Sequence, residues 1–352
     1  MSHSRISIGR RNFLIASGAL AGVSALGLSA ARAQGKLGKA VYGQGSIDPI
    51  FTAGYVALKK GYFGQGGLDV EYLNTQSGPR TNQMLAAGQI LFGATAATAA
   101  PALTVAGKAA ALIYGFDRRM TYANVLVRKT DFDSGKFRSL KDLAGQRIGA
   151  TQPGSVTALM AVYLMQRAGI SDKVDIRPLG DLSTMLGALK VGSVAATMAT
   201  ASMMEQAMQE GWGVPIFDGI NDAAWNEYVG GDVPGIAAYT LRDTIQKRPE
   251  VVQAFVTGLV KAQDFINNNS AEAITDLVYD EYLQALARPS ILKTIALYKK
   301  NVWLKDNVIT EDAYGRMARI MGDGRQFSNE QMKTVPYSLC VDMSFVRKAR
   351  GI

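Results

Sequence analysis

The chain has 352 residues, of which 48% are hydrophobic and 19% are charged, with 37 glycines and 10 prolines. This globular composition is too apolar for a disordered chain and is long enough for two hydrophobic cores or one large α/β unit. His3 is the only histidine and Cys340 the only cysteine. If the N-terminus is removed, the chain therefore has no histidine for a nucleophile pair or a zinc site, and one cysteine cannot form an intramolecular disulfide. We expect no metal and no cofactor.

The first 33 residues have the pattern of a twin-arginine export signal. The pair Arg10-Arg11 precedes a moderately apolar stretch at 13–30, and Ala31-Arg32-Ala33 forms a small-x-small cleavage site before Gln34. The alternative is an anchor helix that stays attached, but glycines and a serine dilute the stretch and make it a poor membrane span. We therefore expect cleavage near Ala33 and export to the periplasm of a bacterium.

The charge that remains after this cleavage is small. Four of the 38 lysines and arginines lie in residues 1–33, which contain no acidic residue, so 34 basic residues face 29 acidic ones and the net charge is +5. Basic clusters include the isolated pairs Lys59-Lys60, Arg118-Arg119 and Lys299-Lys300, and no long basic run occurs. Nucleic-acid binding requires a clustered basic surface, so we expect no nucleic-acid partner. We expect a monomer.

Residues 39–115 alternate between strand and helix patterns. Period-two and short apolar runs predict strands at 39–45, 68–73, 90–94 and 110–115. Helical spacing of apolar residues, with glycine stops, predicts helices at 51–60, 79–87 and 99–107. This repeated β-loop-α order is typical of a parallel sheet covered by helices on both faces.

The pattern then breaks and restarts. Strands are predicted at 124–128, 147–149, 174–179 and 194–198, with helices at 140–144, 154–169 and 181–191. A strand at 235–240 leads into helices at 249–267, 270–286, 289–299, 310–322 and from 329 onwards. We therefore expect a first lobe of residues 36–128 plus 233–352 and a second lobe of residues 129–232. The hinges are expected near 128–130 and 230–236.

Several short segments, in this order and spacing, carry a family resemblance. They are Gly61-Tyr62-Phe63-Gly64-Gln65-Gly66-Gly67-Leu68-Asp69-Val70, Gly78-Pro79, 85–93, 140–149 with Gly154-Ser155, and 239–269. Together they resemble periplasmic solute-binding proteins of the nitrate/sulfonate/taurine type of ABC importer. The resemblance implies a type II periplasmic-binding-protein fold of two α/β lobes, each a mostly parallel sheet flanked by helices. It also implies a small ligand held between the lobes and delivered to membrane permease subunits.

Ligands of open α/β sheets bind beyond the carboxyl ends of the strands and at helix N-termini. On this basis we expect ligand contacts from Ser46, Asp48, Gly78, Arg80, Thr95, Phe116, Gly154, Ser155, Val156, Thr157, Thr200 and Trp225. The helix starts at Gly78–Arg80 and Gly154–Thr157 would present free N–H groups to an anionic or planar ligand, one from each lobe.

Each of these residues also has a plain structural interpretation. Arg80 is either the bidentate partner of an anion or a solvated arginine. Ser155 and the other hydroxyl residues are ligand donors or helix caps and turn groups. Trp225 forms a wall of the cleft or packs in the hinge.

Three functions remain open at this point. The first is a solute-binding protein without enzymatic activity. The second is a ligand-binding sensor or scaffold that signals to a membrane partner, since both need only a closing cleft. The third is an enzyme similar to those that make the thiamin pyrimidine precursor, but that chemistry depends on a histidine and a cysteine-rich motif, which the mature chain lacks. The ligand stays open among aromatic carboxylates, sulfonates, inorganic anions, pyrimidines and amides.

The export signal gives the first testable prediction. Replacing Arg10 and Arg11 by lysine keeps the positive charge but removes the twin-arginine pair, so we expect the precursor to stay in the cytoplasm. Cell fractionation measures this, and N-terminal sequencing of the exported parent chain is expected to begin at or near Gln34. Unchanged export of the lysine variant would contradict the route.

Overall fold

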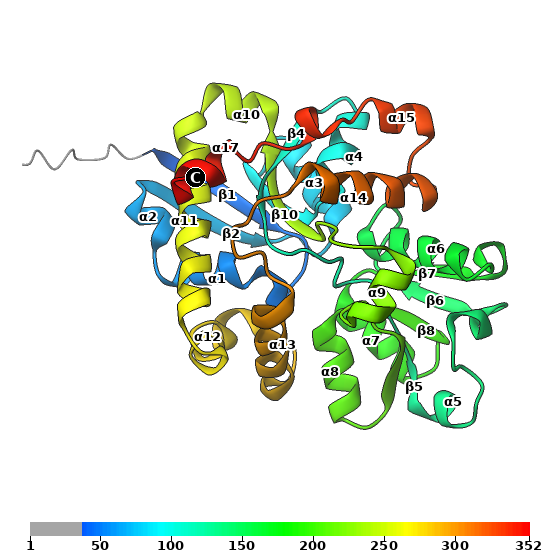
Figure 1. Cartoon of the computed structure of the whole chain (residues 1–352). Coiled ribbons are helices and arrows are strands. Elements are labelled where there is room, and N and C mark those ends of the chain that lie inside the picture. Colours follow the sequence, from blue (N-terminus) through cyan, green and yellow to red (C-terminus); the bar gives the residue numbers. More distant parts are fainter. Residues whose placement is uncertain (1–36) are drawn as a thin grey trace, which may run out of the picture. The chain divides into compact units, whose positions relative to one another are not determined.

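The computed structural model describes residues 37–352, so the predicted export signal lies outside the described residues. Two five-stranded sheets form the framework of this part (Figure 1). The first sheet has the order β2-β1-β3-β10-β4 and the second has the order β7-β6-β8-β5-β9. We call each sheet with its helices a lobe.

The first lobe contains the N-terminal and C-terminal parts of the described chain. Its strands are β1 (Gly38–Gln44), β2 (Leu68–Asn74), β3 (Phe92–Ala96), β4 (Ala110–Gly115) and β10 (Ile236–Leu241). Its first helices are η1 (Pro49–Phe51), α1 (Thr52–Lys59), α2 (Tyr62–Gln65), α3 (Gly78–Ala86) and α4 (Ala99–Val105). After β10 come α10 (Arg242–Lys247), α11 (Pro249–Asn268), α12 (Ala271–Val278), η4 (Tyr279–Leu283), α13 (Arg288–Asn301), α14 (Glu311–Asp323), α15 (Asn329–Lys333), α16 (Tyr337–Cys340) and α17 (Ser344–Arg350).

The second lobe is one continuous stretch of chain. Its strands are β5 (Asn124–Arg128), β6 (Arg147–Ala150), β7 (Asp175–Pro178), β8 (Ala196–Ala199) and β9 (Gly213–Phe217). Its helices are α5 (Lys129–Asp133), η2 (Leu140–Leu143), α6 (Val156–Arg167), η3 (Ser171–Lys173), α7 (Leu182–Lys190), α8 (Ala201–Gln209) and α9 (Asp222–Tyr228).

The two sheets have the same strand arrangement. In each sheet three neighbouring strands are parallel, and one further strand is antiparallel to both of its neighbours. The antiparallel strand is β10 in the first sheet and β5 in the second, and each is the strand that follows a crossing from the other lobe. The predicted fold class, two α/β lobes with mostly parallel sheets, is confirmed.

The structure differs from the sequence-based expectation at the first crossing. Strand β5 was expected to close the first lobe, but it pairs with β8 and β9 in the second sheet. The chain therefore crosses at 116–123, before β5, rather than near 128–130. An apolar strand at the end of a βα series has no local feature that says which sheet it joins, because strand pairing is a tertiary contact.

Strand β9 was not predicted from the sequence. It contains Pro215, which lacks the N–H group that a central strand must donate. Pro215 is compatible with a strand here because β9 is the edge strand of the second sheet and has only β5 as a neighbour. An edge position tolerates proline, whereas a sequence pattern containing proline does not indicate a strand.

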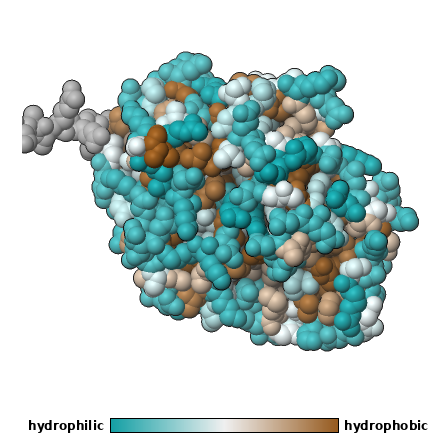
Figure 2. Space-filling model, in the orientation of Figure 1, coloured by the Kyte–Doolittle hydropathy of each residue, from teal (hydrophilic) through white to brown (hydrophobic). Residues whose placement is uncertain are grey.

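Stacked aromatic rings fill the space between the first sheet and its longest helix. Phe255 of α11 stacks on Phe92 of β3 with ring centroids 3.9 Å apart and on Phe63 of α2 at 5.1 Å. All three rings are buried. Helix α11 also packs against α1 and α17, so it anchors the helices on this side of the sheet (Figure 1). Hydrophilic residues cover most of the face shown in Figure 2.

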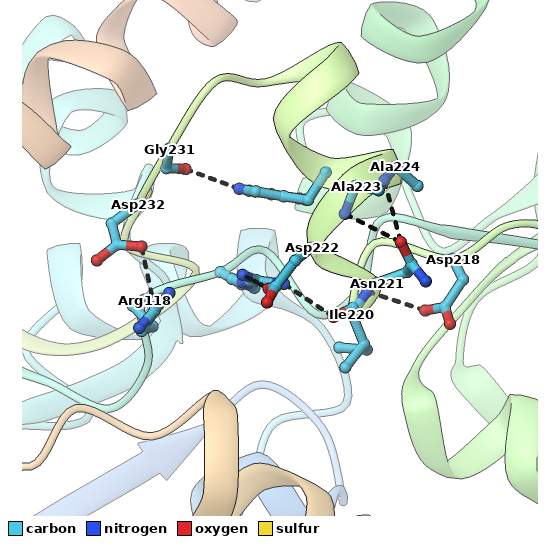
Figure 3. A network of polar contacts seen from close by, with 11 residues as sticks. Arg118, Asp218, Ile220, Asn221, Asp222, Ala223, Ala224, Gly231 and Asp232 are labelled. Atoms are coloured by element: carbon cyan, nitrogen blue, oxygen red, sulfur yellow. Dashed lines mark hydrogen bonds and ion pairs between the residues drawn. The ribbon is translucent and has the colours of Figure 1, made fainter.

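The two crossing segments, 116–123 and 229–235, are bound to each other and to α9. Arg118 pairs with Asp232 at 3.0 Å across the two segments (Figure 3). Arg119 donates to the carbonyl oxygen of Ile220 at 2.8 Å and pairs with Asp222 at the start of α9. The buried carboxylate of Asp117 accepts the N–H groups of Gly235 and Ile236 at 2.7 and 2.8 Å. The crossings are therefore held together by charged and backbone hydrogen bonds rather than by apolar packing alone.

Among residues 37–352, none of the helices combines the length and the apolar composition needed to cross a membrane.

The crossing gives the second prediction, which concerns Gly235. A Cβ atom at this position would overlap the backbone carbonyl oxygen of Arg119, so Gly235→Ala forces the two crossings apart. We expect it to lower the free energy of unfolding by about 1–3 kcal/mol, as overpacking does elsewhere. Urea unfolding measures this. Gly315→Ala, in α14 with open space around it, is the matched control and is expected to lose no stability. Equal stability of the parent and the Gly235 variant would contradict the close approach.

Candidate functional site

A small cavity lies where the carboxyl ends of strands from both sheets meet, and we call it the interlobe cavity. The first lobe contributes Gly45, Ser46, Phe51, Gln76, Ser77, Gly78, Thr95, Ala96 and Ile236 to its lining. The crossing contributes Tyr122, and the second lobe contributes Thr151, Ser155, Val156, Thr157 and Leu182. The cavity volume of about 40 Å³ has room for a few water molecules.

The N-terminus of α3 forms the wall on the first lobe. Ser77 caps this helix, since its Oγ accepts the N–H group of Arg80 at 3.4 Å. The same hydroxyl donates to Oε1 of Gln152 in the second lobe at 3.2 Å, so it joins the two lobes at the cavity. Gly45 allows the loop after β1 to approach, because a Cβ there would meet Thr95 at 2.7 Å and the N atom of Gly78 at 3.3 Å.

The N-terminus of α6 forms the facing wall on the second lobe. Ser155 caps α6 by accepting the N–H group of Ala158 at 3.2 Å. Its hydroxyl also lies 2.9 Å from Oγ1 of Thr157, which in turn lies 2.9 Å from Oγ1 of Thr151. Three buried hydroxyl groups thus form a connected cluster. Such a cluster can reorient its O–H groups to donate to or accept from a ligand.

Ser46 and Tyr122 close one side of the cavity, with their hydroxyl oxygens 2.9 Å apart. Burial raises the pKa of Tyr122 well above its usual value, and the nearby carboxylate of Asp48 raises it further. The tyrosine is therefore a neutral hydroxyl group at neutral pH. Thr95 also lines the cavity and donates to the hydroxyl oxygen of Tyr239 at 3.2 Å.

Asp48 lies behind the cavity and connects the lobes through its carboxylate. One oxygen accepts the N–H group of Ile50 at 2.9 Å, and the other accepts the hydroxyl of Ser202 in α8 at 2.6 Å. The side chain is fully buried. Burial raises the pKa of Asp48 to about 6, although the hydrogen bonds from Ser202 and Ile50 oppose this shift. Asp48 is therefore ionised at neutral pH, and its charge is balanced by hydrogen bonds.

The lining of the cavity carries no formal charge. Among the described residues that line it, none is a lysine, arginine, histidine or carboxylate. Its polar groups are hydroxyls, the Gln76 amide and the N–H groups at the starts of α3 and α6. These helix ends carry partial positive charge, so the cavity can bind an electron-rich group without a cationic side chain.

The structure brings half of the predicted site residues to this cavity. They are Ser46, Gly78, Thr95, Ser155, Val156 and Thr157. Gly154 lies just outside, in a separate hollow between α6 and the loop after α14.

The other predicted residues lie elsewhere. Arg80 was expected to face the cleft, but its guanidinium is exposed and donates to Oε1 of Gln76 at 2.8 Å. Phe116 is buried behind Phe51. Trp225 is buried in α9, where its indole N–H donates to the carbonyl oxygen of Gly231 at 2.7 Å. These side chains belong to the helix surface, the core and the crossing.

Thr200 and Asp48 are also outside the lining. Thr200 caps α8 by accepting the N–H group of Met203 at 3.3 Å and lies 2.7 Å from the hydroxyl of Ser202. Together, Thr200, Ser202 and Asp48 form the hydrogen-bonded contact between the lobes behind the cavity.

Sequence reasoning missed several lining residues, above all Tyr122 and Thr151, and it placed Ser77 in the loop at the cleft without expecting it to contact the ligand. Ser77 and Thr151 could have been found, because each directly precedes or follows an element that the predicted sheet order places at the cleft. Tyr122 had no such signal, since it lies in a crossing whose position was predicted wrongly. Among the described residues, no group of three or more His, Cys, Asp or Glu side chains is placed to hold a metal ion.

The buried carboxyl gives the third prediction. Asp48 binds its proton more tightly in the folded chain than in the unfolded one, so its contribution to stability falls as pH rises from about 4 to about 6. Asp48→Asn keeps an acceptor for the Ile50 N–H but does not titrate. The free energy of unfolding of the parent minus that of the variant is expected to fall by up to about 3 kcal/mol over this range. Urea unfolding at several pH values measures it, and a difference that is constant with pH would contradict the buried, ionisable carboxyl.

Comparison with known proteins assigns the chain to a family. Residues 48–273 match the family described as NMT1/THI5 like. The protein YtlA of Bacillus subtilis (strain 168), which carries the name of a binding protein, is 24% identical over 301 residues, covering 84% of each chain.

Two solved structures show the same fold. The periplasmic nitrate-binding protein NrtA from Synechocystis PCC 6803 superposes with a TM-score of 0.70 at 13% identity, covering 89% of this chain and 88% of that one. The alkanesulfonate-binding protein SsuA from Xanthomonas axonopodis pv. citri, bound to MOPS, superposes with a TM-score of 0.68 at 15% identity, covering 87% and 98%. The family resemblance inferred from the short motifs is confirmed, and the chain belongs to the NMT1/THI5-like family.

Proposed function

We propose that this chain is an exported solute-binding protein that holds a small ligand in the interlobe cavity and delivers it to the permease of an ABC importer. The observation that carries the proposal is the pair of facing helix starts, α3 from the first lobe and α6 from the second, with hydroxyl groups on both walls. Donors from two lobes can bind one ligand only when the lobes are together, so binding and closure are coupled.

The relatives support a binding role. NrtA and SsuA are named for the nitrate and alkanesulfonate that they bind, and YtlA is named as a binding protein. Export through the twin-arginine route, with cleavage near Ala33, fits the periplasmic location in the name of NrtA.

Enzymatic activity is the alternative to which the family name points. The histidine and the cysteine-rich motif of the pyrimidine-precursor enzymes have no counterpart at this site: His3 lies in the predicted export signal, and Cys340 is buried in α16. The lining contains no charged general acid or base. We therefore propose that the protein binds its ligand without converting it. A sensor would use the same closing cleft, and a permease and an ATPase encoded beside this chain would favour import.

The ligand of this cavity is bound without a cationic side chain. Arg80 was the candidate partner of an anion, but it lies on the surface beside Gln76. We propose direct ligand contacts from Ser46, Gly78, Thr95, Ser155, Val156 and Thr157, together with Ser77, Tyr122 and Thr151. An anionic group at this site would be held by N–H and hydroxyl donors alone.

Binding gives the fourth prediction. In a thermal-shift screen of residues 34–352 against nitrate, alkanesulfonates, pyrimidines and amides, we expect at least one compound to raise the melting temperature. At 100 times its dissociation constant a ligand adds about 2.7 kcal/mol of stability. Ser155→Ala is expected to weaken binding of that compound by about 1 kcal/mol in calorimetry, because one hydrogen bond is lost.

Two matched variants make this test specific. Ser270→Ala removes the equivalent cap from α12, away from the cavity, so it is expected to lose similar stability without a change in affinity. Arg80→Ala is expected to bind as tightly as the parent. Equal loss of affinity in the Ser155 and Ser270 variants would contradict the site, and a screen without any stabilising compound would contradict the proposed function.

A further inference from the structure

A groove much larger than the interlobe cavity opens directly beside it. Its volume is about 400 Å³, ten times that of the cavity. Ser46, Gln76 and Leu182 line both spaces, so only these side chains separate the groove from the cavity. The groove also lies between the lobes, because α7 and α8 of the second lobe face Ile47 and the turn at 285–286 of the first.

The groove has a mixed lining, and apolar side chains lie on both of its sides. Leu182 and Leu186 of α7 and Met203 of α8 line one side, and Ile47 and Leu286 line the other. Leu186 and Met203 are 8% and 1% exposed, so their side chains are fixed in the core and present only one edge to the groove. These apolar side chains can bury a hydrocarbon or aromatic group of a ligand.

Three charged residues line the groove: Asp181 caps α7 by accepting the N–H group of Thr184 at 2.7 Å, and Lys190 and Glu210 pair with each other. Lys190 pairs with Glu210 at 2.8 Å, and the same carboxylate accepts the indole N–H of Trp212 at 2.7 Å and the amide of Gln206 at 2.8 Å. The bonds from Lys190, Gln206 and Trp212 lower the pKa of Glu210 to about 2. The carboxylate of Glu210 is thus ionised and already paired, so a ligand needs no charged group at this end of the groove.

The two volumes differ in what they can hold. Pockets that bind organic ligands usually have volumes of about 300–1,000 Å³. The interlobe cavity alone is far below this range, and the groove is inside it. The cavity supplies hydrogen-bonding groups from both lobes, whereas the groove supplies a longer space with apolar residues along it.

We propose that the cavity and the groove are two parts of one binding site and that the ligand is an extended organic solute. Its compact hydrogen-bonding head occupies the interlobe cavity, and its apolar body lies in the groove along α7 and α8. This inference rests on the proposed function, since it names the class of ligand for the same site. It distinguishes this chain from a binder of a compact inorganic anion.

Two series of probes, which share an unbranched hydrocarbon tail but differ in their polar head, test the proposal. The n-alkanesulfonates and the n-alkanamides, each from one to eight carbons, combine a compact polar head with an unbranched tail. Burial of each CH₂ group is expected to tighten binding about fourfold, so the affinity of at least one series rises more than tenfold between two and six carbons. Calorimetry on residues 34–352 measures the affinities, with nitrate as the probe that has no body.

A blocking variant locates the tail. Ala285 is exposed at the rim of the groove, so Ala285→Trp fills space that the tail needs and leaves the cavity intact. We expect this variant to bind the six-carbon probe at least tenfold more weakly and the one-carbon probe with unchanged affinity. Ala273→Trp, an exposed position in α12 outside the groove, is the matched control and is expected to change neither affinity.

Fluorescence supplies a second measurement. Of the three tryptophans, Trp225 and Trp303 are buried, and Trp212 is partly exposed in the groove. A long probe is expected to protect Trp212 from iodide quenching, and Trp212→Phe is expected to abolish this protection.

Several results would overturn the inference. Long probes that bind no more tightly than short ones, or an Ala285→Trp variant that weakens short and long probes alike, would show that the groove holds no tail. A lack of binding by every long probe would also overturn it. If nitrate or another compact solute still stabilises the protein, the proposed function stands while this inference falls.

Discussion

The carboxylate of Asp117 holds together the two crossing segments, 116–123 and 229–235, which connect the two lobes. It lies on the first crossing and accepts two N–H groups of the second, at Gly235 and Ile236. Burial raises the pKa of Asp117 well above the usual value for an aspartate, because removal from water disfavours the charged carboxylate. The backbone of the two crossings approaches so closely that only glycine fits at position 235.

This joint explains why the two sheets share one arrangement. After each crossing the chain forms the antiparallel strand of the sheet that it enters. This strand is β5 after the first crossing and β10 after the second. The parallel strands beside them then end at the same edge, and the loops that follow β1, β3 and β6 meet at the interlobe cavity. The position of the site is thus a consequence of how the crossings are bound.

Contacts between the lobes include polar ones around the cavity, besides the packing of α13 on α8 and of α14 on α6. The polar contacts include the Asp48–Ser202 and Ser77–Gln152 hydrogen bonds. A neutral hydrogen bond such as Ser77–Gln152 contributes about 1 kcal/mol net, and one to a charged group such as Asp48 about 1.5–3 kcal/mol, because water replaces both when the groups separate. Polar contacts of this kind open at modest cost, which suits a protein proposed to close on a ligand and release it. An apolar interface of similar size would resist opening more strongly.

The sequence alone determined the family, the fold class and the order of most elements. The glycine-stopped βα repeats and the short motifs around 61–93 and 140–155 are local features, and local periodicity is visible without the structure. It also pointed to Ser155 and Thr157 at the cleft, because a helix start after a parallel strand has a defined place in such sheets.

Only the tertiary structure decided where the chain crosses and which side chains face the ligand space. The sequence of β5 does not indicate which sheet it joins, and the place of Arg80 in the first turn of α3 does not indicate that its side chain is exposed beside Gln76. The groove beside the cavity brings α7 and α8 opposite a turn at 285–286, about a hundred residues away in sequence. Such contacts arise from packing between segments distant in the chain, and no periodicity within a segment encodes them.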